Sequence, residues 1–142
     1  MGGLTRYKDG RFTIFTEKDG LETTHIRTIV EDHEGALWFG TSRGLSRYKD
    51  GKFSNYSFPH PSETGPSGVN CIYEDAEHVI WFGTMGSGLG RLKNGKLAAY
   101  GTKPNDMFSI FIDTVDATGT SVRGMRKRVV AEFAIFIAAQ SA

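Results

Sequence analysis

The strongest constraint on the fold of this chain is a phrase of ten residues that occurs twice. Residues 32–41 read DHEGALWFGT and residues 75–84 read DAEHVIWFGT, so that Trp38 and Trp81 hold the same place 43 residues apart. A repeat of roughly 40–45 residues with Trp and Gly at fixed places is typical of one blade of a β-propeller. The recurring positions that we interpret as structural are Asp32, Trp38, Gly40, Asp75, Trp81 and Gly83.

A second recurring phrase predicts a β-hairpin. It occupies residues 3–12 and 44–53, with a looser copy at 88–97, and in each copy short apolar runs flank Asp-Gly or Asn-Gly. Such dipeptides favour a type I′ turn, because both central residues of that turn need a positive φ. We interpret each copy as the outer hairpin of a blade.

Two further strands are predicted before each of the later hairpins. The triplets at 37–39 and 80–82 are apolar throughout, which is typical of strands buried on both faces, as blades are between their neighbours. Asp32 and Asp75 are expected to cap the turns before these triplets by accepting bonds from backbone N–H groups. Gly40 and Gly83 are expected where another backbone approaches closely.

The predicted fold class is therefore all-β, built from four-stranded antiparallel propeller blades. Full repeat units are expected at about 25–57 and 69–100, and partial blades at 3–15 and 105–113. The first domain is then a partial propeller over residues 1–113.

After Tyr100 the pattern weakens, and residues 114–142 are interpreted as a degenerate tail. No Trp-x-Gly-Thr follows the last match to the repeat, and an apolar run begins at Val129. Val129, Phe133 and Phe136 share one helical face, which predicts a short helix within 126–139. This helix could cover an exposed blade edge. We favour the alternative, in which the tail is unrelated to the repeat and arises from an interrupted reading frame.

Composition narrows the range of partners. With 39% hydrophobic and 23% charged residues and a net charge of +1, the chain has the profile of a soluble globular protein, without the basic footprint of a nucleic-acid binder. A single cysteine excludes an internal disulfide.

We find no signal peptide and no apolar stretch of about 20 residues, so no membrane contact is expected from this segment. Expressed as written, the chain would stay in the cytoplasm.

The loops favour one face as a binding surface. The loop at 58–68 and the link at 85–87 are longer than their counterparts and emerge on the same face as the 42–43 link. Repeat proteins often bind partners on the face that carries insertions, although exposed loops also tolerate insertion without a function. The candidates for ligand contact on this loop face are Arg43, His60, Met85 and Ser87.

Residues for catalysis or for metal binding are not recognisable. The four histidines occupy unrelated repeat positions without metal-ligand spacing, so we expect surface histidines and no metal site. The glycine-rich segment 86–90 joins two predicted strands and opens no helix, which excludes a dinucleotide site. No catalytic residue and no cofactor are predicted. The histidines are His25, His33, His60 and His78.

Taken together, the phrases resemble the two-component regulator propeller repeat. The resemblance covers residues 2–113 and is most specific over 26–56. It implies the sensor part of a bacterial hybrid two-component system: a periplasmic propeller of about seven blades, often one of two in tandem. Such a propeller binds a ligand such as a carbohydrate fragment and signals through a membrane helix to a histidine kinase. With two full units, the chain is interpreted as a fragment or a truncated relative.

The predicted function is a non-catalytic module that senses a small polar ligand such as a carbohydrate. One alternative is a structural interaction module that forms homo-oligomers through its open blade edges. A propeller lyase is the other alternative, but it would need acid, base or metal-binding residues that converge near the central axis. The sequence shows no such set.

Overall fold

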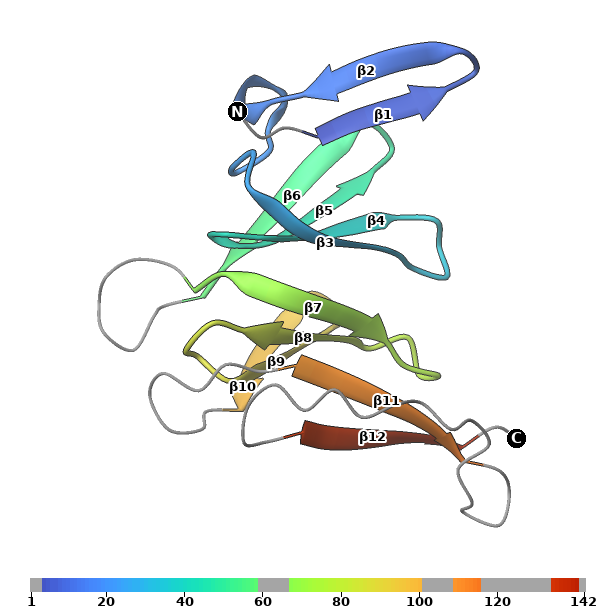
Figure 1. Cartoon of the computed structure of the whole chain (residues 1–142), viewed down its shortest axis with the longest axis vertical. Coiled ribbons are helices and arrows are strands. Elements are labelled where there is room, and N and C mark those ends of the chain that lie inside the picture. The colour runs from blue at the N-terminus through green and yellow to red at the C-terminus, as the bar shows by residue number, and fades with distance from the viewer. Residues whose placement is uncertain (1–3, 59–66, 101–108, 116–133, 141–142) are drawn as a thin grey trace.

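The structure is a computed structural model, and it describes residues 4–58, 67–100, 109–115 and 134–140 (Figure 1). Its regular elements are almost all strands, which confirms the predicted all-β class. No helix within these ranges has the length and apolar character needed to cross a membrane. In chain order the elements are β1 (Leu4–Lys8), β2 (Arg11–Phe15), the 3-10 helix η1 (Glu17–Asp19), β3 (Ile26–Glu31), β4 (Leu37–Thr41), β5 (Gly44–Lys49), β6 (Lys52–Ser57), β7 (Val69–Glu74), β8 (Ile80–Thr84), β9 (Leu89–Lys93), β10 (Lys96–Tyr100), β11 (Ser109–Val115) and β12 (Ala134–Gln140).

The strands form two four-stranded antiparallel sheets in the order β3-β4-β5-β6 and β7-β8-β9-β10. The hairpin β1-β2 precedes them, and the pair β11-β12 follows. Figure 1 shows the four groups one after another along the long axis, with β3, β7 and β11 side by side. The first strand of each sheet therefore faces the first strand of the next, as in adjacent propeller blades.

The predicted C-terminal helix is wrong where the structure describes that segment. Residues 134–140 form β12, which pairs in parallel with β11 from Ser109 opposite Ala134 to Val115 opposite Gln140. A short apolar run does not distinguish a helix from a buried strand by its periodicity. Branched and aromatic residues favour a strand once a partner edge is available, and β11 supplies that edge. Residues 126–133 of the predicted helix lie outside the described residues.

The three hairpins have the predicted turn chemistry. Both central residues of each turn have a positive φ, as a type I′ turn requires. The values are 52° and 76° at Asp9-Gly10, 51° and 81° at Asp50-Gly51, and 51° and 72° at Asn94-Gly95. The dipeptides therefore determine where the chain turns back after β1, β5 and β9.

The core lies between the two four-stranded sheets. Trp38 and Phe39 are buried, at 4% and 1% exposed, which confirms that this strand is covered on both faces. A Cβ atom on Gly40 would lie 2.7 Å from the carbonyl oxygen of Val69, so the expected close approach is also present there. The buried cluster that joins the sheets contains Trp38, Leu45, Phe58, Val69, Ile80, Phe82 and Leu92.

Each four-stranded sheet contains an Asp–Trp bracket, in which one carboxylate holds both the turn and the tryptophan. Asp32 accepts hydrogen bonds from the backbone N–H groups two and four residues along the chain (3.0 and 2.8 Å) and from the indole N–H of Trp38 (2.7 Å). Asp75 accepts the same three bonds at 2.9, 2.9 and 2.7 Å, the last from Trp81. The predicted capping role is confirmed, and the bond to tryptophan adds a link from turn to core.

Replacing Asp75 with Asn tests the Asp–Trp bracket. An amide can accept fewer of the three bonds and carries no charge, so Asp75→Asn should lower the free energy of unfolding by about 1–3 kcal/mol. Urea unfolding of the full chain, followed by circular dichroism, measures the change. The matched control is Asp50→Asn, because Asn94 already occupies the equivalent turn position in another hairpin. Equal losses in the two variants would contradict the bracket.

Candidate functional site

A cleft with a volume of 560 Å³ lies between the two four-stranded sheets. Its lining includes the turns after β3 and β7 and the β9–β10 turn, which lie at the end of the sheets opposite the predicted loop face. Ligand pockets in proteins typically measure about 300–1,000 Å³, so the cleft is large enough for a small molecule. The first sheet contributes Asp32, His33, Glu34, Trp38, Arg47 and Tyr56, and the second contributes Glu74, Glu77, His78, Ile80, Leu92 and Lys93.

Charged pairs surround this cleft. In the first sheet, the guanidinium of Arg47 and the ammonium of Lys49 donate to one carboxylate oxygen of Glu34, at 3.2 and 2.6 Å. In the second sheet, Lys93 pairs with Glu77 at 3.1 Å. The hydrogen bond from Lys49 holds the pKa of Glu34 below its usual range. Both signs of charge are therefore available to a polar ligand.

The same Arg47 side chain lies over Trp38, with its guanidinium carbon 5.5 Å from the ring centroid. Its Nε is also 4.0 Å from the carboxylate of Asp32. Burial tends to raise the pKa of Asp32, but the hydrogen bonds from Trp38 and the backbone outweigh it, so this pKa lies below its ordinary value. The pKa of Asp75 is also lowered: burial tends to raise it, but the hydrogen bonds from Trp81 and the backbone outweigh that effect.

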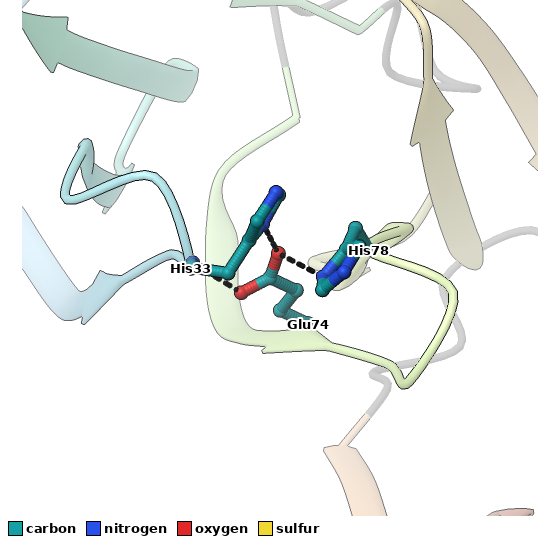
Figure 2. Close-up of side chains that lie close together, drawn as sticks. All are labelled: His33, Glu74 and His78. Atoms are coloured by element: carbon teal, nitrogen blue, oxygen red, sulfur yellow. Dashed lines mark hydrogen bonds and ion pairs between the residues drawn. The ribbon is translucent and has the colours of Figure 1, made fainter.

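His33, Glu74 and His78 form a cluster on the wall of the cleft, and we call it the His–Glu–His cluster (Figure 2). The backbone N–H of His33 donates to Oε2 of Glu74 at 2.8 Å, and Nδ1 of His33 is hydrogen-bonded to Oε1. Nδ1 of His78 lies 3.3 Å from the same Oε1. The two imidazole rings stack, with centroids 3.6 Å apart and planes at 21°. One carboxylate thus contacts histidines from the turns of two sheets.

The cluster forms because equivalent turns carry different residues. The turn after β3 has His33 and ends in Gly35, whereas the turn after β7 ends in His78 at the place of that glycine. Both end residues adopt a left-handed backbone, with φ of 75° and 62°. Glycine adopts this conformation without a steric cost, and histidine is one of the residues enriched there.

Sequence reasoning missed this cluster, since it compared the histidines as repeat positions and found no ligand spacing. His33 lies 41 residues before Glu74, and only the packing of one blade on the next brings them together. One feature of the sequence could have indicated it. His33 and His78 lie in equivalent turns of two consecutive repeats, and equivalent turns of adjacent blades lie next to each other.

The residues predicted for ligand contact lie on the opposite face, except His60, which lies outside the described residues. Ser67 hydrogen-bonds the hydroxyl of Ser87 and donates to the carbonyl oxygen of Met85 (3.1 Å), so the loops after β6 and β8 meet as expected. Arg43 is exposed. Ligand contact by these residues stays a prediction.

Glu22, in the loop before β3 on the same face, carries a partly buried carboxyl group. Its Oε2 atom is buried and has no hydrogen-bond partner among the described residues. Burial raises the pKa of this carboxyl, and the nearby Arg43 guanidinium partly opposes the shift.

Comparisons with known proteins agree with this architecture. Residues 20–43 and 65–86 match the family described as two component regulator propeller. Two solved structures of the extracellular domain of BT4673 from B. thetaiotaomicron, described once as a one component system and once as a hybrid two component system, superpose with a TM-score of 0.69. Their sequence identities to this chain are 26% and 27%. No curated protein matches the chain.

The superposed part covers 83% of this chain and 16% or 17% of those domains, so the chain spans about a sixth of their length. Fold and repeats together define this chain as a β-propeller protein. Within this architecture, residues 20–43 and 65–86 match the two-component regulator propeller repeat, as the repeat phrases suggested.

The lowered pKa values of Asp32 and Asp75 predict sensitivity to acid. The unfolded carboxyls titrate near pH 3.9, so the stabilisation is complete above about pH 4 and is lost as pH falls through the lower folded values. Urea unfolding across about pH 2–7 should show this loss, and the double variant Asp32→Asn/Asp75→Asn should show a shallower one. Parallel curves for the two proteins would contradict the assignment.

Proposed function

We propose that this chain is a ligand-sensing segment of the propeller of a two-component signalling regulator, and that its cleft binds a small polar ligand such as a carbohydrate. The observation that carries this proposal is the 560 Å³ cleft lined by polar and charged groups from two adjacent repeat units. The similar solved structures are extracellular domains, which supports a periplasmic location for the parent protein.

The lining of the cleft suits a hydroxyl-rich ligand. Tyr56 stacks on Trp38, with ring centroids 5.9 Å apart, and offers an aromatic body with a polar tip. Carboxylates and cationic groups around it can accept from and donate to sugar hydroxyls. Because the two walls belong to different blades, a bound ligand would alter the contact between blades, and that change is the basis of sensing.

We also infer that the module is not an enzyme. The acids at the cleft are engaged in structural interactions. Asp32 accepts three hydrogen bonds, Glu34 pairs with two cations, and Glu77 pairs with Lys93. Glu74 accepts from the backbone N–H of His33 and contacts the imidazoles of His33 and His78. A general base needs an accessible lone pair directed at its substrate. Their present roles favour binding over catalysis.

A glycan panel tests the proposed site. Titrations of the full chain, followed by tryptophan fluorescence and calorimetry, should identify an oligosaccharide ligand. Removing one charged donor with Lys93→Ala should weaken binding by about tenfold, because each such hydrogen bond is worth about 1.5 kcal/mol.

The matched control is Arg43→Ala on the loop face, which should bind as the unchanged chain does. If Arg43→Ala abolishes binding and Lys93→Ala does not, the cleft is the wrong site. If neither the chain nor a longer form that contains it binds any member of the panel, the carbohydrate proposal fails.

The assembly alternative also has a specific observation in its favour. The hairpin β1-β2 exposes Tyr7 (66%), Phe12 (74%) and Ile14 (67%), and a contiguous apolar surface of this kind usually contacts another surface. If this face joins two copies, light scattering should detect a dimer that the double variant Phe12→Ser/Ile14→Ser converts to a monomer. A chain that is monomeric at every concentration would exclude this function.

A further inference from the structure

We propose that the His–Glu–His cluster is a binding site for a divalent transition metal ion, with Zn²⁺ as the best match, and that the bound ion links the two blades. His33, Glu74 and His78 each offer one ligand atom, and these atoms all lie within 4.8 Å of one another. This inference does not depend on the proposed ligand of the cleft.

The donor set selects the metal. Two imidazole nitrogens and one carboxylate oxygen are a common Zn²⁺ ligand set, whereas Mg²⁺ and Ca²⁺ prefer oxygen ligands alone. Bonds of about 2.0–2.2 Å in a tetrahedron place neighbouring ligand atoms about 3.3 Å apart. Nδ1 of His78 and Oε1 of Glu74 already have this separation, at 3.3 Å. Nδ1 of His33 lies closer than this to Oε1, and a rotation of the exposed His33 side chain would bring it to the same separation.

The carboxylate is already oriented for this role. The backbone N–H of His33 holds Oε2 of Glu74 at 2.8 Å, which leaves Oε1 directed at both imidazoles (Figure 2). The Glu74 side chain is only 14% exposed, so packing restricts its motion. Ligands that are held by a second partner in this way bind metal more tightly, because less order is lost on binding.

The backbone at His78 supports the same inference. Its φ of 62° is one that glycine adopts without a steric cost, and Gly35 occupies the equivalent place in the other turn. Left-handed backbone at a residue other than glycine costs free energy and is concentrated at functional sites. This backbone places the imidazole beside Glu74, with Nδ1 of His78 3.3 Å from Oε1.

The ion would join elements far apart in the sequence. His33 belongs to the turn after β3, while Glu74 ends β7 and His78 follows in the next turn. All three residues line the cleft, so the fourth coordination position is open to water or to an anionic group there. Zinc binding would thus stabilise the contact between blades, because the ion binds the folded chain more tightly than the unfolded one.

The first experiment titrates the full chain with Zn²⁺ alone, by calorimetry and by thermal unfolding, after treatment with a chelator. We expect one ion per chain and a rise in Tm of about 5–10 °C at a hundredfold excess over Kd. Mg²⁺ should have no effect. Co²⁺ in place of Zn²⁺ should give the visible absorption of a tetrahedral site.

Two variants and one control assign the ligands. His78→Gly removes one ligand and relieves the left-handed backbone, so the chain should still fold. Its Zn²⁺ affinity should fall by at least about 10–100-fold, which is the loss caused by removing only an outer hydrogen-bond partner of a ligand. His33→Gln should lower the affinity similarly. His25→Gln replaces an exposed histidine outside the cluster and should leave the affinity unchanged.

No binding of Zn²⁺ by the unchanged chain would overturn the proposal and leave hydrogen bonding as the role of the cluster. Unchanged affinity in both His78→Gly and His33→Gln would overturn it as well, since the ion would then bind elsewhere. Neither outcome would contradict the proposed carbohydrate binding, because these experiments measure only the binding of Zn²⁺.

Discussion

The buried face of each blade depends on the Asp–Trp bracket. A carboxylate at the edge of a core is costly unless its oxygens are hydrogen-bonded, and Asp32 and Asp75 each accept three N–H groups. Two of these bonds shape the turn and the third holds the indole. With the ring held in this way, Trp38 packs in the cluster that reaches Val69 on the next sheet. The bracket thus connects a local turn to the packing of blade on blade.

Repetition of the bracket aligns the turns of neighbouring blades. Equivalent turns then lie beside each other, and any residues that differ between them can meet. His33 and His78 are such differences, since Ala76 and Gly35 stand at the corresponding positions of the other turn. The backbone geometry that both repeats share holds the turns in place, and the residues that differ between the repeats form the polar cluster. Both the cleft and the His–Glu–His cluster follow from this arrangement.

The first hairpin shows how much each blade depends on its neighbours. Phe15 of β2 contacts Tyr48 and Phe53 of the next sheet, with ring centroids 5.2 and 5.6 Å apart. Tyr7, Phe12 and Ile14 of this hairpin remain exposed, as does Ile29 of β3, at 53%. A blade buries its two faces only between two others. This dependence agrees with the much greater length of the similar solved domains, of which the chain spans about a sixth.

Local features of the sequence determined the strands, the hairpins and the caps. Asp-Gly and Asn-Gly specify their turns by the backbone angles they tolerate, and Asp32 caps a turn four residues long; both effects act within a few residues. Only the tertiary structure decided whether Ile135 and its neighbours form a strand or a helix, because the outcome depends on the edge of β11. It alone also placed His33 beside Glu74, since a contact across 41 residues exists only after one blade packs on the next.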